Sequence, residues 1–402
     1  MERTRPRGDG TVAATGVLTA AMGFSMLQLF LIGALGPLIV PELGLSAVQL
    51  GLTTTVGFGL AALLSPLAGR AVDALGPRRC LVALLLLAGG ALGLIAVAPG
   101  YGVLLLAVGI GGVPQALANP ATNKAILATI PVARRATVTG AKQSGVQLGA
   151  IAAGLPLTLL AGVTDWRTAA GAAAGVAVLG ALWAWRVLPA DPGDRRDGAG
   201  IGGDRHEPAG SPVVRWLAVY SFLLGAGLAS VNTYLALFGE QRLGLSTTVA
   251  GVSVAMLGLA GIVGRIGWAR AAGRPGMAVV LPAGLALGSA CAATLLAAAL
   301  WATPLIWAAV FGIGFFGMAG NAVSMVLVIQ RAAPGRAGRD SALVAAGFFA
   351  GFAVGPPVFG ALLSGNGYGV GWFLVAGSFA AAAAVAGAWA RRDRRTPDRL
   401  RA

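Results

Sequence analysis

The sequence predicts an all-α polytopic membrane protein, and two observations carry that prediction. Hydrophobic residues make up 57% of the 402 residues and charged residues only 11%, whereas charged residues make up about a quarter of a soluble domain. Apolar runs of roughly 20 residues, the length that crosses a bilayer, recur along almost the whole chain. Twelve transmembrane helices are therefore expected, near residues 13–40, 48–68, 80–98, 102–130, 136–161, 166–188, 214–239, 247–269, 276–300, 304–330, 340–363 and 370–390.

A polar stretch in the middle of the chain divides these spans into two halves. Residues 189–213 are rich in Gly, Asp, Arg and Pro and contain little to bury, which favours a cytoplasmic linker. Six spans precede it in residues 1–188 and six follow in residues 214–402, which end in a basic tail. The tetrapeptide Leu-Gly-Leu-Ser recurs at residues 43–46 and 243–246, after the first span of each half. This recurrence indicates an internal duplication.

The distribution of basic residues predicts the orientation in the membrane. The net charge is +15, but it is spread over short connections rather than gathered with aromatic residues, which argues against binding of nucleic acid. Only Arg167 and Arg242 fall in the predicted outward loops, so both termini are expected in the cytoplasm. The first apolar run is too long for a signal peptide. Arginine outnumbers lysine 27 to 2, which is typical of a GC-rich bacterial genome and favours the inner membrane of a bacterium.

The loop between the second and third spans, residues 69–79, carries a recognisable pattern. Gly69 is followed after three residues by Asp73, after two more by Gly76, and then by Arg78 and Arg79. This pattern resembles the loop signature of the major facilitator superfamily of secondary transporters. The resemblance implies two six-helix halves around a central site, and movement of a small solute by alternating access.

The resemblance also implies that this loop is a cytoplasmic latch between the halves. Asp73 would pair with Arg78 or Arg79 near the start of span eleven, around Arg339 and Asp340. The alternative is that the arginines only set the orientation of the chain. The predicted latch residues are Gly69, Asp73, Gly76, Arg78 and Arg79.

Polar side chains inside the spans predict which helices line the solute cavity, because uncompensated polar groups in hydrocarbon are costly. Gln115, Asn119 and Asn123 recur every four residues and form one stripe on span four. The alternative is that such side chains only hydrogen-bond neighbouring helices. The cavity candidates are Gln28, Gln115, Asn119, Asn123, Lys124, Lys142, Gln143, Gln147, Asn232, Thr233 and Asn321.

Lys124 and Lys142 are the basic candidates in this set. Intramembrane charges are functional candidates by default, so both lysines could hold an anionic group of the solute. The alternative is that both reach the cytoplasmic headgroups through their long stems. Residues 119–124, together with residues 142–145, resemble bacterial permeases of cyanate-type and other small anions.

Small residues at helical spacing predict close helix packing. The packing candidates are Gly145, Gly149, Gly351, Gly355 and Pro356. Residues 355–360 resemble the Gly-Pro signature of proton-driven drug exporters, but that signature belongs on span five, and residues 105–111 lack the exporter arginine of span four. Both departures argue against a drug and proton antiporter.

The function expected from the sequence is secondary transport of a small organic solute, with an anionic solute as one form of this prediction. A proton-driven drug or metabolite exporter and a non-transporting sensor on the same fold are the alternatives, and proton coupling stays open. The sequence contains no arrangement typical of an enzyme. Cys80 and Cys291 are far apart and predict no metal site or disulfide. No cofactor is expected, and the protein is predicted to act as a monomer in the bilayer.

Overall fold

A computed structural model of the chain describes residues 9–191, 212–274, 276–331 and 337–395. These residues form helices and no strands. Twelve helical segments are long and apolar enough to cross a membrane, which confirms the predicted fold class. Most of the predicted linker, residues 192–211, lies outside the described residues, as do the N-terminal 1–8 and C-terminal 396–402.

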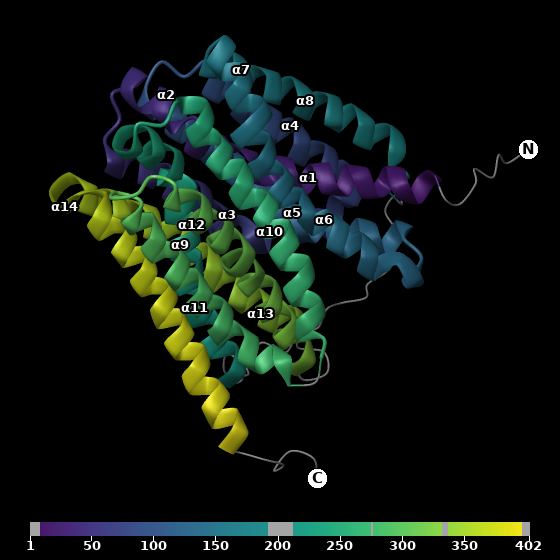
Figure 1. The fold of residues 1–402 in the computed structure, drawn as a ribbon. Coiled ribbons are helices and arrows are strands. Elements are labelled where there is room, and N and C mark those ends of the chain that lie inside the picture. Colours follow the sequence, from purple (N-terminus) through teal and green to yellow (C-terminus); the bar gives the residue numbers. More distant parts are fainter. Residues whose placement is uncertain (1–8, 192–211, 275, 332–336, 396–402) are drawn as a thin grey trace, which may run out of the picture.

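We use the name N-terminal half for the helices up to Leu188 (Figure 1). Its helices are α1 (Asp9–Ala34), α2 (Gly36–Glu42), α3 (Ala47–Leu75), α4 (Pro77–Ala96), α5 (Tyr101–Thr129), α6 (Val132–Ala152), η1 (Ala153–Leu157), α7 (Thr158–Val163) and α8 (Trp166–Val187). Span five is α6, η1 and α7 in sequence, and Pro156 lies inside its π-helical turn. Such turns commonly bend a helix.

The C-terminal half begins at Pro212 and has the same order of long helices. Its helices are α9 (Pro212–Leu243), α10 (Thr247–Ala272), α11 (Met277–Ala298), α12 (Leu305–Gly312), η2 (Ile313–Gly317), α13 (Met318–Arg331) and α14 (Ala337–Arg395). The last of these contains two membrane spans, because the backbone turns at Gly367, where φ is 76°. A positive φ of this size favours glycine.

Residues 69–79, which the sequence predicts to be a loop, are mostly helical in the structure. Helix α3 continues through Gly69 and Asp73 to Leu75, and α4 begins at Pro77. The turn is therefore the single residue Gly76, whose φ of 88° and ψ of 157° lie in a region that is essentially restricted to glycine. Pro77 follows at the first position of α4, where its missing N–H costs no hydrogen bond.

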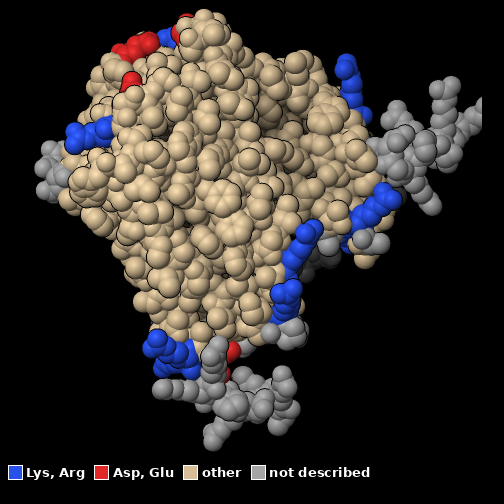
Figure 2. All heavy atoms as spheres, viewed as in Figure 1, with Lys and Arg blue, Asp and Glu red and all other residues tan. Residues whose placement is uncertain are grey.

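The bundle has a terminal face, where α1 starts and α14 ends, and an opposite face with α2 and α7 (Figure 1). In the view of Figure 2, the charged side chains lie mostly near these ends, and an uncharged surface separates them. A band of this kind is what a bilayer requires around a spanning protein.

The two halves make close backbone contact toward the opposite face. The Thr55 hydroxyl donates a 2.6 Å hydrogen bond to the Ala353 carbonyl, which joins α3 to α14. A Cβ atom on Gly51 would lie 2.6 Å from the carbonyl carbon and oxygen of Pro356, so only glycine fits there. Near the terminal face α1 and α14 diverge, and their ends lie far apart in Figure 1. The structure is therefore closed at the opposite face.

Three predicted packing positions lie at close helix contacts. A Cβ atom on Gly351 would lie 2.1 Å from the Phe222 carbonyl oxygen of α9, and one on Gly355 would lie 2.2 Å from that of Ala226. On α6, a Cβ atom at Gly145 would lie 2.1 Å from the Thr19 carbonyl oxygen of α1. These helices approach each other closely enough to exclude a side chain.

Candidate functional site

Buried polar side chains from both halves meet in the middle of the bundle. Gln28 of α1 and Gln115 of α5 are 4% and 6% exposed, and the Gln28 amide nitrogen donates to the Val108 carbonyl at 3.3 Å. The hydroxyls of Thr54 on α3 and Thr233 on α9 are 3.2 Å apart, so a hydrogen bond connects the halves here. These side chains surround a cavity of about 10 Å³, close to the volume that one water needs.

Two acceptor atoms at this cavity have no protein partner. The side-chain oxygens of Gln28 and Gln115 are buried without a hydrogen bond. An unsatisfied buried oxygen is costly, which favours a water or a donor group of a bound ligand at this position. We call Gln28, Thr54, Gln115 and Thr233 the central cluster.

The stripe on α5 continues from the central cluster toward the terminal face. Asn119 and Asn123 are exposed although they lie inside a membrane span. Exposed amides are costly in hydrocarbon, so these two line a water-accessible space rather than the lipid. The Gln143 amide nitrogen of α6 lies 3.4 Å from the Asn119 side-chain oxygen. The predicted stripe on α5 and the cavity candidate Gln143 on α6 are thus brought together.

Lys142 lies beside this stripe and is fully buried. Its Nζ atom donates hydrogen bonds to the Thr122 hydroxyl at 2.7 Å and to the Asn123 side-chain oxygen at 2.6 Å. No described carboxylate pairs with Lys142, whereas Lys124 pairs with Asp73 and Arg167 with Glu42. A buried charge without a counter-ion is destabilising.

Arg265 of the C-terminal half brings a second cation against α6. It is half-buried on α10, and its guanidinium lies 3.5 Å from the Gln143 carbonyl of α6. With the Gln147 amide nitrogen donating to the Gln143 carbonyl at 3.1 Å, the Gln147 oxygen accepts from Arg265 at 3.3 Å. The Nε atom of Arg265 has no hydrogen-bond partner.

The sequence analysis did not select Arg265 as a cavity candidate. It lies in a degraded echo of the loop signature at residues 264–270, where an arginine is easily interpreted as a loop residue. Its position within the apolar run at 247–269 is the signal that could have found it, because charges inside spans are functional candidates.

Lys124 and Asp73 form an ion pair of 2.8 Å on the terminal side of the N-terminal half, with side chains 38% and 71% exposed. The Lys124 amine also donates to the Val72 carbonyl at 3.1 Å. Asp73 is thus paired within its own half, with a lysine of α5 rather than with an arginine of the loop. The side chains of Arg339 and Asp340 lie outside the described residues.

The two loop arginines contact Asp191, which lies near the start of the predicted linker. The Asp191 carboxylate accepts the backbone N–H groups of Arg78 at 2.9 Å and Arg79 at 3.0 Å. An anion there satisfies free donors at the start of α4. The Arg78 guanidinium donates to the Trp185 carbonyl and lies 4.1 Å from the centre of the Trp185 ring. Asp191 was missed by sequence reasoning, because its partners are backbone groups more than 100 residues away.

Of the predicted candidates on the C-terminal half, Thr233 belongs to the central cluster, whereas Asn232 and Asn321 do not. The Asn232 amide donates to the Leu228 carbonyl of its own helix at 2.8 Å, and its side-chain oxygen has no partner. Asn321 on α13 is half-buried, and its side-chain oxygen also lacks a partner. Neither side chain makes a hydrogen bond to the central cluster.

A larger groove of about 880 Å³ runs between α1 and α6. It lies on the other side of α6 from Gln143 and Gln147, since its α6 lining includes Gly145 and Gly149. The Thr15 and Thr19 hydroxyls that line it donate to carbonyls of α1. This apolar groove offers few free polar groups, so the polar stripe is the better candidate site.

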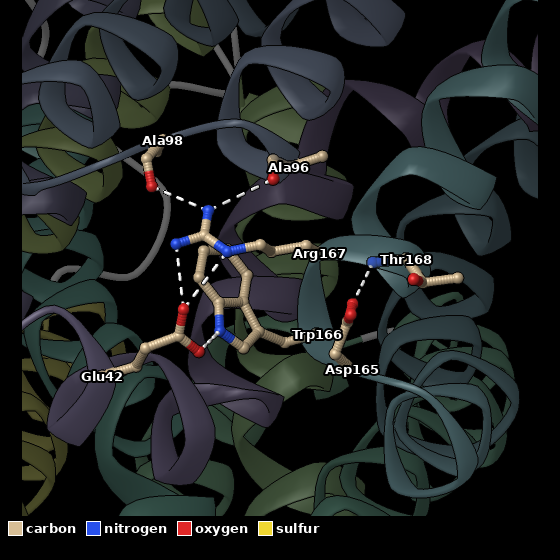
Figure 3. Close-up of polar contacts among 7 residues, drawn as sticks. All are labelled: Glu42, Ala96, Ala98, Asp165, Trp166, Arg167 and Thr168. Atoms are coloured by element: carbon tan, nitrogen blue, oxygen red, sulfur yellow. Dashed lines mark hydrogen bonds and ion pairs between the residues drawn. The ribbon is translucent and has the colours of Figure 1, made fainter.

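At the opposite face, a set of contacts holds three loops of the N-terminal half together (Figure 3). Glu42, which ends α2, accepts from the Trp166 indole at 2.5 Å and from Arg167 at 2.9 Å. Arg167 also donates to the carbonyls of Ala96 and Ala98 at 3.3 and 2.8 Å. These contacts join the end of α2, the end of α4 and the start of α8.

Asp165, beside this set, begins α8 as its N-cap. Its carboxylate accepts the Thr168 backbone N–H at 2.6 Å. This backbone hydrogen bond, followed by one to the Thr168 side chain, lowers the pKa of Asp165 below its usual value.

The comparisons with known proteins agree with this architecture. The family model of the Major Facilitator Superfamily matches residues 14–345. A bacterial homologue of the human lysosomal transporter Spinster, solved in an inward-facing and unoccupied conformation, is similar with a TM-score of 0.71 and 16% identity, over 97% of this chain and 100% of that one. The human organic anion transporter MFSD10 is similar with a TM-score of 0.67 and 18% identity, over 95% and 100%.

A search of the curated proteins found no match in sequence. At these low identities the solved structures show the fold alone. The family match covers most of the chain, and it agrees with the twelve membrane spans and with the loop signature at residues 69–79. The chain therefore belongs to the Major Facilitator Superfamily, and it is a multi-pass membrane transporter rather than an enzyme.

Proposed function

We propose that this transporter moves a small organic anion by alternating access, and that Lys142 and Arg265 bind the negative group of the solute. The observation that carries the proposal is the pair of cations beside one polar stripe, one from each half, without a carboxylate partner among the described residues. An anion between them would supply the missing counter-charge.

Charge accounts for the choice of an anion. Lys142 is surrounded by neutral oxygens, which solvate an ammonium group only in part. Arg265 has an unpaired Nε atom, and its contacts with the Gln147 and Gln143 oxygens are long, at 3.3 and 3.5 Å. Its guanidinium can therefore bind a carboxylate without first breaking a strong ion pair. Arginine suits a planar carboxylate because its donors form a fixed fork.

The two cations come from different halves of the protein, and this supports a role in transport. Lys142 belongs to α6 and Arg265 to α10, and these helices face each other across the boundary between the halves. A solute that contacts both halves changes the relative stability of their arrangements, as alternating access requires. The exposed amides of Asn119 and Asn123 would form the wall along which the solute reaches this position.

The central cluster would bind the polar remainder of the solute. Gln28 and Gln115 each direct an unpaired oxygen into the bundle, so a hydroxyl or amide donor on the solute would satisfy them. The Thr54–Thr233 hydrogen bond lies next to that position and would have to break when the opposite face opens.

We also propose the membrane, the orientation and the oligomeric state of this transporter. The positive loops favour the cytoplasmic membrane of a bacterium, with the terminal face inside the cell. The chain would act as a monomer, in which the loop at residues 69–79 latches the terminal face when the opposite face opens. Among the described side chains no Asp or Glu is buried, which favours transport of an anion without a buried proton carrier.

A binding experiment tests the assignment of the two cations. Purified protein would be screened by thermal unfolding against small carboxylates and their uncharged amides. The carboxylates should stabilise the parent, and Lys142→Gln and Arg265→Gln should each weaken binding by about tenfold or more, which is about 1.4 kcal/mol. Lys142→Arg should bind more tightly than Lys142→Gln.

Two variants serve as controls for the loss of one positive charge. Arg134→Gln on α6 and Arg270→Gln on α10 each remove an exposed arginine from the same helix as one of the two cations. Binding should be unchanged in both. Equal binding of carboxylates by Lys142→Gln, Arg265→Gln and the parent would overturn the assignment. Binding without solute flux would favour the sensor alternative.

A further inference from the structure

A second cavity lies between the halves at the opposite face, separate from the polar stripe. Its volume is about 430 Å³, within the range of small-molecule sites. Leu45 near the start of α3 lines it from the N-terminal half, and Leu237 of α9 and Leu363 of α14 line it from the C-terminal half. Gln241, Arg242 and Tyr368 supply its polar groups.

The polar groups converge on one side of this cavity. The Tyr368 hydroxyl donates to the Gln241 side-chain oxygen at 2.9 Å, which fixes the orientation of both side chains. Tyr368 is buried against Phe238 and Trp372, with ring centres 5.2 and 6.5 Å apart. The amide nitrogen of Gln241 is left free to donate to a ligand.

Arg242 is the charged group of the cavity. It is exposed in the last turn of α9, and it forms no ion pair with a described residue. Glu240 is the other charged group near the Tyr368 hydroxyl, but it does not line the cavity. By contrast Arg167, the other arginine of this face, is paired with Glu42.

We infer that this cavity is a second binding site for small amphipathic carboxylates, with the carboxylate on Arg242 and Gln241 and the hydrocarbon part against the three leucines. The guanidinium provides paired donors for a carboxylate, and burial of the apolar part against leucine side chains favours binding. We call this the outer site.

The outer site would also bias the conformation of the transporter. Leu45 belongs to one half, whereas Gln241, Arg242 and Tyr368 belong to the other, and the cavity exists because the halves meet at this face. A ligand that contacts both sides binds best while the opposite face is closed, so it favours that arrangement. The inference is independent of the proposed function, because none of its residues belongs to the polar stripe.

Cysteine protection tests the outer site with a defined probe. Cys80 and Cys291 are the native cysteines, and Cys80→Ala and Cys291→Ser remove them. A Leu363→Cys variant in this background, reconstituted in lipid nanodiscs, would be modified with a water-soluble maleimide. Sodium hexanoate should slow modification at least threefold, and hexanamide at the same concentration should slow it much less.

Three further variants give the test its specificity. Arg242→Gln should abolish protection by hexanoate, whereas Arg242→Lys should keep part of it because the charge remains. Lys142→Gln combined with Arg265→Gln should keep full protection, which separates this site from the proposed solute site. No protection of the parent by hexanoate, or equal protection in Arg242→Gln, would overturn the outer site.

Discussion

At the scale of single residues, Lys142 has the least ordinary environment in the bundle. It is fully buried, and only the neutral side chains of Thr122 and Asn123 bind its amine. Lys124, 18 positions earlier, is partly exposed and paired with Asp73. Both lysines lie inside predicted spans, but Lys124 has a carboxylate partner and Lys142 has only neutral ones. Such an arrangement is destabilising without a counter-ion, and the proposed anion would supply one.

Lys142→Met should therefore raise the midpoint of thermal unfolding of the anion-free protein. The substitution removes a buried charge that has no counter-ion and keeps a side chain of similar length, and we expect a gain of about 1 kcal/mol or more. Thermal unfolding in detergent measures it. The matched control Lys124→Met should change the midpoint little, because an exposed ion pair contributes little. A lower midpoint for Lys142→Met would show that the lysine is structurally required.

Residue spacing alone predicted part of the site. The period of four that aligns Gln115, Asn119 and Asn123 follows from helix geometry, and the structure does place the Asn119 side chain against Gln143. The contacts of Arg265 and Asp191 depend instead on which helices pack together, because their partners are far away in sequence. Lys124 was grouped with Lys142 for the same reason, since spacing shows depth in the membrane but not the neighbour.

At the scale of elements, the link between α3 and α4 depends on one glycine. Gly76 has a backbone conformation that other residues rarely adopt, and a Cβ atom there would lie 2.2 Å from the carboxyl carbon of Asp191. The loop signature therefore specifies a sharp turn, with the Asp191 carboxylate against the first N–H groups of α4. The sequence pattern identified this glycine, but the extension of α3 to Leu75 was not expected.

Gly76→Ala should destabilise the protein by about 1–3 kcal/mol, because alanine is strained at this positive φ and its methyl group would displace Asp191. The comparison is Gly69→Ala in the same signature. Gly69 is helical with open space around it, so alanine there should be neutral or stabilising by up to about 1 kcal/mol. Chemical unfolding in detergent measures both. Equal effects of the two substitutions would contradict the role of the turn.

Asp73 is proposed to take part in opening and closing of the terminal face. In this structure it is bound to Lys124 of its own half, and the proposed latch would require it when the terminal face closes. Asp73→Asn should then favour the arrangement with an open terminal face, whereas Lys124→Gln should release Asp73 for the latch and favour closure. An Asn119→Cys variant reports both effects, since this position is exposed now. Its modification by a maleimide should be faster with Asp73→Asn and slower with Lys124→Gln; the same rate in all three proteins would contradict the latch.

At the scale of the whole molecule, hydropathy predicted the twelve spans, and the family resemblance predicted their arrangement. The closed opposite face was not predictable from the sequence. Alternative arrangements of such halves commonly differ by only a few kcal/mol, and the balance here depends on particular contacts such as Thr55–Ala353 and Thr54–Thr233. Under the proposed alternating access, these contacts would separate in every transport cycle.

A disulfide across this contact should therefore stop transport reversibly. Thr55→Cys combined with Ala353→Cys, without Cys80 and Cys291, would join α3 to α14 where they are in hydrogen-bond contact. Oxidation should abolish flux and leave carboxylate binding largely intact, and reduction should restore flux. Either cysteine alone is the control. Full flux after complete cross-linking would show that the opposite face does not have to open.

Flux of a labelled carboxylate into proteoliposomes tests the central claim most directly. The carboxylate that stabilises the purified protein most strongly would be used at a range of concentrations. We predict saturable uptake by the parent and by Arg270→Gln, and a loss of about tenfold or more in uptake efficiency with Arg265→Gln. Absence of saturable uptake, or equal uptake by Arg265→Gln and the parent, would contradict transport of an anion held between the two halves.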